Sequence, residues 1–317
     1  MKNQRIAYLL FAIWVIALAS TPWIANNYIV KIATFLAMYA AIALSWNFIG
    51  GFAGYPSFAT GAFIGLGAYS GALLQNTGWF APLAWGAAMV IVVVFAALVG
   101  KVILKMKGHY FAIGSIALVE VLSHGASSWS RLTGGGEGLN VAIMAGGPDF
   151  IGKVFLFTMI TIMLMAFIAT VIVDKSRLGF GLRCIQQNED AADMLGVNVM
   201  HYKLLAFILS GVFCGGIGAA YASWVAYISP GDSFSILVTL KAAVMVLLGG
   251  AGTVFGPLVG SAVFVIFEEL IWSKFLDYHQ GILGLVVVLL IFFLPNGLLK
   301  IKSVSYTHLT LPTKRIV

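Results

Sequence analysis

The chain has 317 residues, of which 61% are hydrophobic and only 9% are charged, and its formal net charge is +7. Soluble domains carry roughly 25% charged residues, and a soluble fold of this size has too little interior to bury so much apolar side-chain surface. The composition therefore excludes a soluble globular protein and predicts an integral membrane protein. Cys184 and Cys214 are too few to form a disulfide scaffold, and their spacing is not that of metal ligands.

The apolar runs predict an all-α polytopic membrane protein. About 20 apolar residues cross a bilayer as a helix, and no run alternates apolar and polar residues as the strands of a membrane barrel do. We expect about ten transmembrane helices, within a range of about 8 to 10, in a single transmembrane domain over residues 1–302. In chain order the candidate spans are 6–24, 28–49, 55–75, 81–104, 110–129, 151–173, 203–228, 234–250, 257–273 and 280–298. The third, eighth and ninth are short or rich in glycine, which predicts re-entrant pieces there.

Lysine and arginine accumulate in the short cytoplasmic loops of membrane proteins, and this rule orients the spans. Ten spans with a cytoplasmic N-terminus also place the C-terminus in the cytoplasm. The basic residues on the cytoplasmic side are then Lys2, Arg5, Lys101, Lys105, Lys107, Lys175, Arg177, Arg183, Lys203, Lys300 and Lys302. Those outside are Lys31, Arg131, Lys153 and Lys274. The positive charge is therefore interpreted as a topology signal, and nucleic-acid binding is not needed to explain it.

The largest cytoplasmic loop on this topology, 174–201, contains the sequence NEDAADMLG, which predicts a short helix. Asn188 is a good N-cap, because its side-chain oxygen can accept a hydrogen bond from a free N–H group of the first turn. Glu189 follows where the positive end of the helix dipole favours a carboxylate. Gly196 suits the position after the helix, which often requires a positive φ. A helix of about two turns is marginal alone in water, so we expect something to hold it.

Two interpretations of this short helix remain open. Four residues provide a small apolar surface: Ala191, Ala192, Met194 and Leu195. The small alanines permit close approach, which favours a docking helix for a cytosolic partner. The alternative is a solvated connector, since short motifs also arise by chance. The chain has no G-x-x-x-x-G-K-[ST] phosphate loop, so it does not bind ATP by that route.

The stretch RLGFGLRCIQQNEDAADMLGVNVMHYKLLAFILSG, which begins at Arg177, resembles the cytoplasmic coupling segment of ATP-binding-cassette importer permeases. It is most similar to the branched-chain amino acid permease family, in its M-type subunit. The family pattern NE-x-A-A-x-x-x-G is met by Asn188, Glu189, Ala191, Ala192 and Gly196. Further blocks agree in order: LSWNFIGGFAGYPSFATGAFIGLGAY, GHYFAIGSIALVEV, LTGGGEGLN, YISPGDSF, VMVLLGGAGTVFGPLVGSAVF and LPNGLL. The resemblance covers residues 28–300 or so, and the combination of blocks is far more specific than any one of them.

The resemblance implies a permease subunit that translocates branched-chain amino acids, or a related small amino acid or amide, across the bacterial inner membrane. It implies that ATP is bound by two separate cytosolic ATPase subunits, so this chain would need no cofactor. The other implied partners are a second homologous permease subunit and a periplasmic or lipid-anchored substrate-binding protein. In that family the short helix after the loop fits a cleft on the ATPase subunit, which gives the five pattern residues an ATPase-coupling role.

Parts of the chain depart from the family pattern. The sequence PSFAT, residues 56–60, stands where members often have a Gly-His pair, and this difference bears on the pore. Gln186 and Gln187 stand where charged residues are common, which bears on the strength of docking. The tail, 303–317, turns abruptly polar and matches nothing in the family, so we expect a disordered extension or a segment foreign to the gene.

Ionisable residues inside spans are costly and indicate a substrate path or a structural pair. Glu120 lies near the middle of its span, with His124 one turn later. These two residues, with Ser57 and Thr60, are candidates for a translocation path. The alternative for Glu120 is a structural i,i+4 pair with His124. Other charged residues lie nearer the span ends, where snorkelling suffices to explain them: Lys241, Glu268 and Glu269.

No Ser-His-Asp set, paired-carboxylate site or metal cluster stands out in the sequence, so we expect neither an enzyme nor a metal site. Two alternative functions remain beside the branched-chain amino acid importer. One is a urea or short-amide permease, because such permeases share this family's pattern. The other is an autonomous secondary transporter, in which Glu120 and His124 would form a proton relay.

Overall fold

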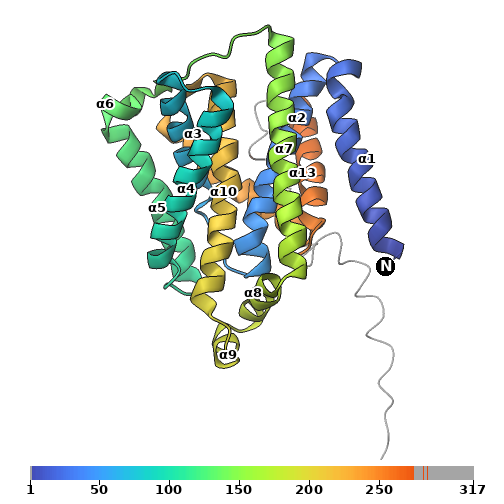
Figure 1. Cartoon of the computed structure of the whole chain (residues 1–317), viewed down its shortest axis with the longest axis vertical. Coiled ribbons are helices and arrows are strands. Elements are labelled where there is room, and N and C mark those ends of the chain that lie inside the picture. The colour runs from blue at the N-terminus through green and yellow to red at the C-terminus, as the bar shows by residue number, and fades with distance from the viewer. Residues whose placement is uncertain (1, 275–280, 282–283, 285–317) are drawn as a thin grey trace, which may run out of the picture.

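The computed structural model describes residues 2–274, together with Gly281 and Gly284 (Figure 1). Its α-helices are α1 (Lys2–Ile24), α2 (Asn27–Trp46), α3 (Thr60–Asn76), α4 (Ala81–Ile103), α5 (His109–Ser128), α6 (Ser130–Thr133), α7 (Pro148–Lys175), α8 (Arg177–Gln187), α9 (Glu189–Met194), α10 (Val199–Val225), α11 (Pro230–Ser233), α12 (Ile236–Gly249) and α13 (Gly256–Lys274). A π-helical turn, η1 (Asn47–Phe52), follows α2, and a 3-10 turn, η2 (Gly135–Glu137), follows α6. Two short strands, β1 (Leu139–Asn140) and β2 (Tyr227–Ile228), pair antiparallel.

The long helices confirm an all-α polytopic membrane protein. Within residues 2–274, helices occupy nine of the ten predicted spans, from α1 to α13. In the part of the chain that the structure describes, seven segments are long and apolar enough to cross a membrane. The tenth predicted span, 280–298, lies outside the described residues except for Gly281 and Gly284, and so does the tail 303–317.

The bundle is built around α10, which packs against α2, α3, α4 and α7 (Figure 1). The helix α1 lies at the periphery, and few of its side chains are buried. The short helices α8 and α9 lie together at one end of the bundle, at the bottom of Figure 1, and α6 lies at the opposite end. Because α10 begins directly after α9 and crosses the whole bundle, it connects the two ends.

Glycine lets α3 and α10 approach each other closely. A Cβ atom on Gly67 would lie 2.2 Å from the carbonyl oxygen of Gly215, and one on Gly218 would lie 2.0 Å from that of Ile64. Any larger residue would force the two backbones apart. The glycines of the third span therefore serve close packing of α3 against α10.

Two helices are interrupted inside the bundle, in the third and eighth spans. The helix α3 begins at Thr60 rather than at 55, because the preceding backbone bonds to other elements: the N–H of Phe58 donates to Ser115 Oγ of α5 at 2.9 Å. The first turn of α12 lies against the first turn of α3, where the N–H of Gly61 donates to Thr239 Oγ1 at 3.0 Å. Such irregular backbone is tolerated at membrane depth only where protein groups satisfy it, as these do.

A buried asparagine joins the π-turn η1 to the connection between α12 and α13. Asn47 accepts a hydrogen bond from the N–H of Gly252 at 3.0 Å and donates one to the carbonyl of Thr253 at 3.1 Å. The π-turn therefore holds both the end of α2 and the tight α12–α13 turn in place.

Candidate functional site: the α8–α9 segment

The segment between α7 and α10 is a pair of short, well-capped helices. Ser176 caps α8 by accepting a hydrogen bond from the N–H of Gly179. Asn188 ends α8 and begins α9: its backbone N–H donates to the carbonyl of Cys184, and its side-chain oxygen accepts from the N–H of Ala191 at 3.0 Å. The predicted helix and its predicted N-cap at Asn188 are therefore confirmed.

The C-terminal end of α9 closes in a Schellman motif. The N–H of Gly196 donates to the carbonyl of Asp193 at 2.9 Å, and the N–H of Val197 donates to that of Ala192 at 3.0 Å. Gly196 has φ +84°, a conformation that β-branched residues resist, and this confirms the positive φ expected there.

The two faces of α9 differ sharply in exposure. Ala192 is only 1% exposed and packs into the chain's own core, whereas Met194 and Leu195 are 86% and 81% exposed. Ala191 is exposed as well. Of the four residues expected on the apolar surface, only Ala192 needs correction, because it faces inward, whereas Ala191, Met194 and Leu195 face outward.

Glu189 fastens α9 to the transmembrane helices. Its carboxylate accepts hydrogen bonds from Lys203 Nζ of α10, at 2.9 Å, and from the hydroxyl of Tyr55, in the connection before α3. Lys203 also donates to the carbonyl of Leu104 at the end of α4, at 3.1 Å, and lies 4.5 Å from the centroid of the Tyr55 ring. The Lys203 side chain is only 3% exposed. We call Tyr55, Leu104, Glu189 and Lys203 the tether.

Charge strengthens the tether at neutral pH. Burial alone would raise the pKa of Glu189, but the hydrogen bonds from Tyr55 and Lys203 and the charges of Lys203 and Lys107 outweigh it, and the pKa lies below its usual value of 4.5. Asp190 forms an exposed ion pair with Lys107 at 2.7 Å, which lowers the pKa of Asp190 and raises that of Lys107. An exposed pair of this kind contributes little to stability, so the buried tether dominates.

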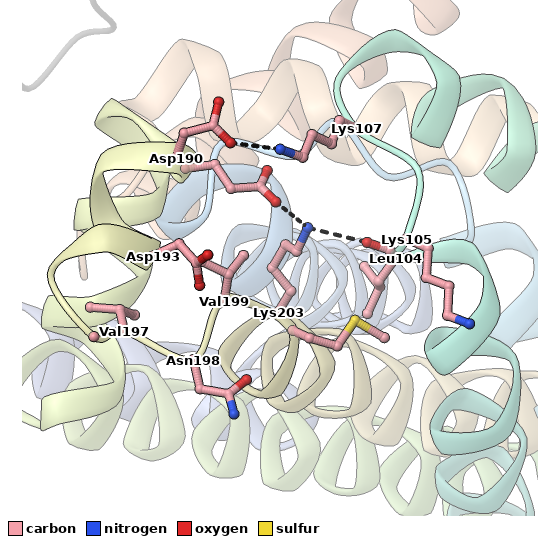
Figure 2. A pocket seen from close by; sticks show the side chains of 12 residues that line it. Leu104, Lys105, Lys107, Asp190, Asp193, Val197, Asn198, Val199 and Lys203 are labelled. Carbon is pink, nitrogen blue, oxygen red and sulfur yellow. Dashed lines mark hydrogen bonds and ion pairs between the residues drawn. The ribbon is translucent and has the colours of Figure 1, made fainter.

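A cavity of about 590 Å³ opens beside the tether, lined by the α4–α5 connection, α9 and the start of α10. Figure 2 shows Lys107 reaching Asp190 on one side of it and Lys203 reaching the backbone oxygen of Leu104 below. Within the described residues, only one face of α9, the face of Ala192, is covered by the rest of the chain. The outer face of α9 carries the exposed side chains of Met194 and Leu195.

The other candidate residues lie apart from α9. Glu120 and His124 form the expected i,i+4 pair on α5, with 3.7 Å between Oε2 and Nε2, and both side chains are exposed on the outer face of that helix. Ser57 and Thr60 are buried where α3 is interrupted, and the carbonyl of Ser57 accepts a hydrogen bond from the indole of Trp46. The hydroxyl of Thr60 has no hydrogen-bond partner among the described residues. The structure therefore does not bring the four into one site.

Sequence reasoning missed the partners of Glu189. Tyr55 falls inside a predicted span, and Lys203 was counted only among the cytoplasmic basic residues that orient the spans. One signal was available, because a lysine within the first turns of an otherwise apolar helix needs a partner when buried. No pattern of spacing links Tyr55 to Glu189, which are 134 positions apart.

Comparison with known proteins places the chain among transport proteins. The model of a family described as "Branched-chain amino acid transport system / permease component" matches residues 28–292. The chain is 26% identical to the high-affinity branched-chain amino acid transport system permease protein LivM of Salmonella typhimurium, over 92% of this chain and 74% of LivM. It is 24% identical to LivH of Escherichia coli, over 82% of this chain and 91% of LivH. The nucleoside ABC transporter permease protein NupC of Lactococcus lactis is 39% identical over 26% of this chain and 27% of NupC. No solved structure matches.

Proposed function

Because the chain belongs to the family of permease components of branched-chain amino acid transport systems, we propose that α9 is the joint through which a cytosolic ATPase drives this permease. The chain is the membrane-spanning permease subunit of an ATP-binding-cassette importer for branched-chain amino acids. Its family is a transporter family and not an enzyme family. We assign ATP binding and hydrolysis to two separate cytosolic subunits, and substrate delivery to an external binding protein.

The observation that carries the coupling proposal is the exposure of Met194 and Leu195 on a helix otherwise tied into the membrane domain. Burying one such side chain against a partner would stabilise a complex by about 1.5 to 3 kcal/mol. Because Glu189 links α9 to Lys203 of α10 and to Tyr55 before α3, displacement of α9 would move two transmembrane elements together.

The proposal requires the α8–α9 end of the bundle to face the cytoplasm. Support comes from the basic residues, which the fold separates by end. Those at the α8–α9 end are Lys101, Lys105, Lys107, Lys175, Arg177 and Arg183, and those at the other end are Lys31, Arg131 and Lys153. With 280–298 as a tenth span, both termini lie in the cytoplasm and the protein resides in the bacterial inner membrane.

The second permease subunit is assigned to the outer face of α5. Glu120 and His124 point outward there, so a relay inside this chain alone has no structural support. Ionisable side chains that face lipid are costly, which favours a protein neighbour on this face. Similarity to both LivM and LivH suits a pair of homologous permeases, with the translocation path between them.

The coupling proposal is tested by placing a charge on the outer face of α9. Leu195→Asp should leave the amount of protein in the membrane unchanged, weaken co-purification of the ATPase subunit and abolish ATP-driven leucine uptake, because a carboxylate would have to be buried in the apolar contact. Ile143→Asp is the matched control, since Ile143 is 78% exposed and lies before α7, at the opposite end. Wild-type ATPase binding and uptake by Leu195→Asp would return α9 to the status of a connector.

A further inference from the structure

A second cavity, of about 830 Å³, lies between α2, α3, α10, α12 and α13 and has no part in the α9 site. Binding pockets for small molecules are apolar concavities of about 300 to 1,000 Å³ with a few convergent polar groups. Most of the lining is apolar and includes Met38, Ile42, Ile64 and Val244. This cavity therefore has the size and the composition of a ligand site.

Three of the polar side chains that line the cavity lie close together. Lys241 of α12 forms an ion pair with Glu268 of α13, and its ammonium group lies 5.6 Å from the centroid of the Tyr39 ring of α2. Both members of the pair are partly buried and line the cavity. Snorkelling to the membrane surface does not explain them, because each charge finds its partner inside the protein.

The position of the cavity suits delivery from the end opposite α9. Its lining includes Tyr227 of β2 and Asp232 of α11, which belong to the connection between α10 and α12. Since α10 runs from α9 to the far end of the bundle, this connection lies at the far end. In the proposed orientation that end faces the external binding protein.

We propose that this cavity binds a zwitterionic amino acid with an apolar side chain, an assignment that rests on the proposed function. The carboxylate of the amino acid pairs with Lys241 and its ammonium group with Glu268, while its side chain lies among the apolar residues. Binding of the zwitterion replaces the ion pair between Lys241 and Glu268 by two ion pairs with the ligand. Neither of these two side chains is then left without a partner of opposite charge. A ligand with a single charge would leave either Lys241 or Glu268 without a partner. An uncharged ligand would lose its hydration without gaining an ion pair in return.

The test is equilibrium binding of radiolabelled L-leucine to the purified permease–ATPase complex, without ATP and without the binding protein. We expect saturable binding that valine and isoleucine displace, and that isopentylamine, 4-methylpentanoate and guanosine do not. Lys241→Met should weaken leucine binding by about tenfold or more, because the carboxylate loses its partner. Displacement by guanosine, or equally by the amine and the acid, would overturn the zwitterion assignment.

A double variant guards against misfolding. Lys241→Met leaves Glu268 without a partner, whereas Lys241→Met/Glu268→Gln removes both charges together and should assemble normally while still losing leucine binding. Lys31→Met is the matched control: Lys31 lies on α2 near the same end, beside Phe35, but outside the cavity. Wild-type leucine affinity in the double variant would show that the pair is structural only.

Uptake separates this proposal from the proposed function. If the wild-type complex imports leucine with ATP and the double variant has the same KM and rate, the cavity assignment fails and the importer stands. If leucine binding depends on Lys241 but ATP drives no uptake, the importer fails and the cavity assignment stands.

Discussion

At the scale of single residues, the α9 site depends on one buried cation. Lys203 satisfies three groups at once: the Glu189 carboxylate, the Tyr55 hydroxyl and the Leu104 carbonyl. Removing one partner of a buried ion pair is strongly destabilising, because it leaves an uncompensated charge. The tether should therefore be far more sensitive at Lys203 than at the exposed pair of Lys107 and Asp190.

Lys203→Met is expected to destabilise the tether by about 3 to 5 kcal/mol, because Glu189 is left buried and unpaired. Tyr55→Phe removes two hydrogen bonds, the one that the hydroxyl donates to Glu189 and the one that it accepts from Lys203, and should cost about 0.5 to 1.5 kcal/mol for each. The measurement is hydrogen exchange of the α9 amides, with thermal unfolding in detergent beside it. Lys203→Met/Glu189→Gln should recover part of the loss. Equal protection of α9 in Lys203→Met and in wild type would show that the tether contributes nothing.

At the scale of elements, α9 owes its shape to its two ends. Six residues make too few internal hydrogen bonds for an independent helix, and Asn188 and Gly196 supply what is missing. The sequence indicated both caps, because capping depends on residues close together in the chain. It did not indicate which side of α9 is covered, because that depends on distant segments, and Ala192 was therefore given to the wrong face.

Gly196→Val should disrupt the end of α9 at a cost of about 1 to 3 kcal/mol, since a β-branched residue must adopt φ +84°. Weak co-purification of the ATPase subunit and reduced uptake should follow, with normal membrane insertion. Gly147→Val is the control, because Gly147 has φ −73° and a Cβ atom there would meet nothing within 4 Å. If both variants bind the ATPase equally well, the geometry of this turn has no part in coupling.

At the scale of the whole molecule, the length of the apolar runs predicted where nine helical segments lie within residues 2–274. Hydropathy counts succeed because every backbone group in a bilayer must be satisfied, which leaves little besides helices. They fail where helices are interrupted, since the backbone around the start of α3 is satisfied by side chains of other helices, Ser115 and Thr239. The tether was out of reach for the same reason, because it joins segments that only the fold brings together.

A cytoplasm-dependent reporter should be active when fused after Lys107 or near Asn188 and silent when fused near Gly136. The reason is that the first two positions lie at the basic α8–α9 end, and Gly136 lies at the other end. Reporter activity by position is the measurement, and a periplasm-dependent reporter at the same sites should give the reverse pattern. Cytoplasmic activity at Gly136 would contradict the orientation and the ten-span count together.

The double anchoring of α9 also limits how its sequence can be exchanged between relatives. A graft of residues 177–198 from another permease would bring a new partner preference. It would not bring the residues that anchor α9, since Tyr55, Leu104 and Lys203 all lie outside the graft. The residues that must change together, those of α9 and those that anchor it, are therefore encoded in separate parts of the gene. Chimaeras that change partner specificity should need the host positions 55 and 203 to match the donor, and recombination within the loop alone should yield permeases that insert but do not respond to their new ATPase.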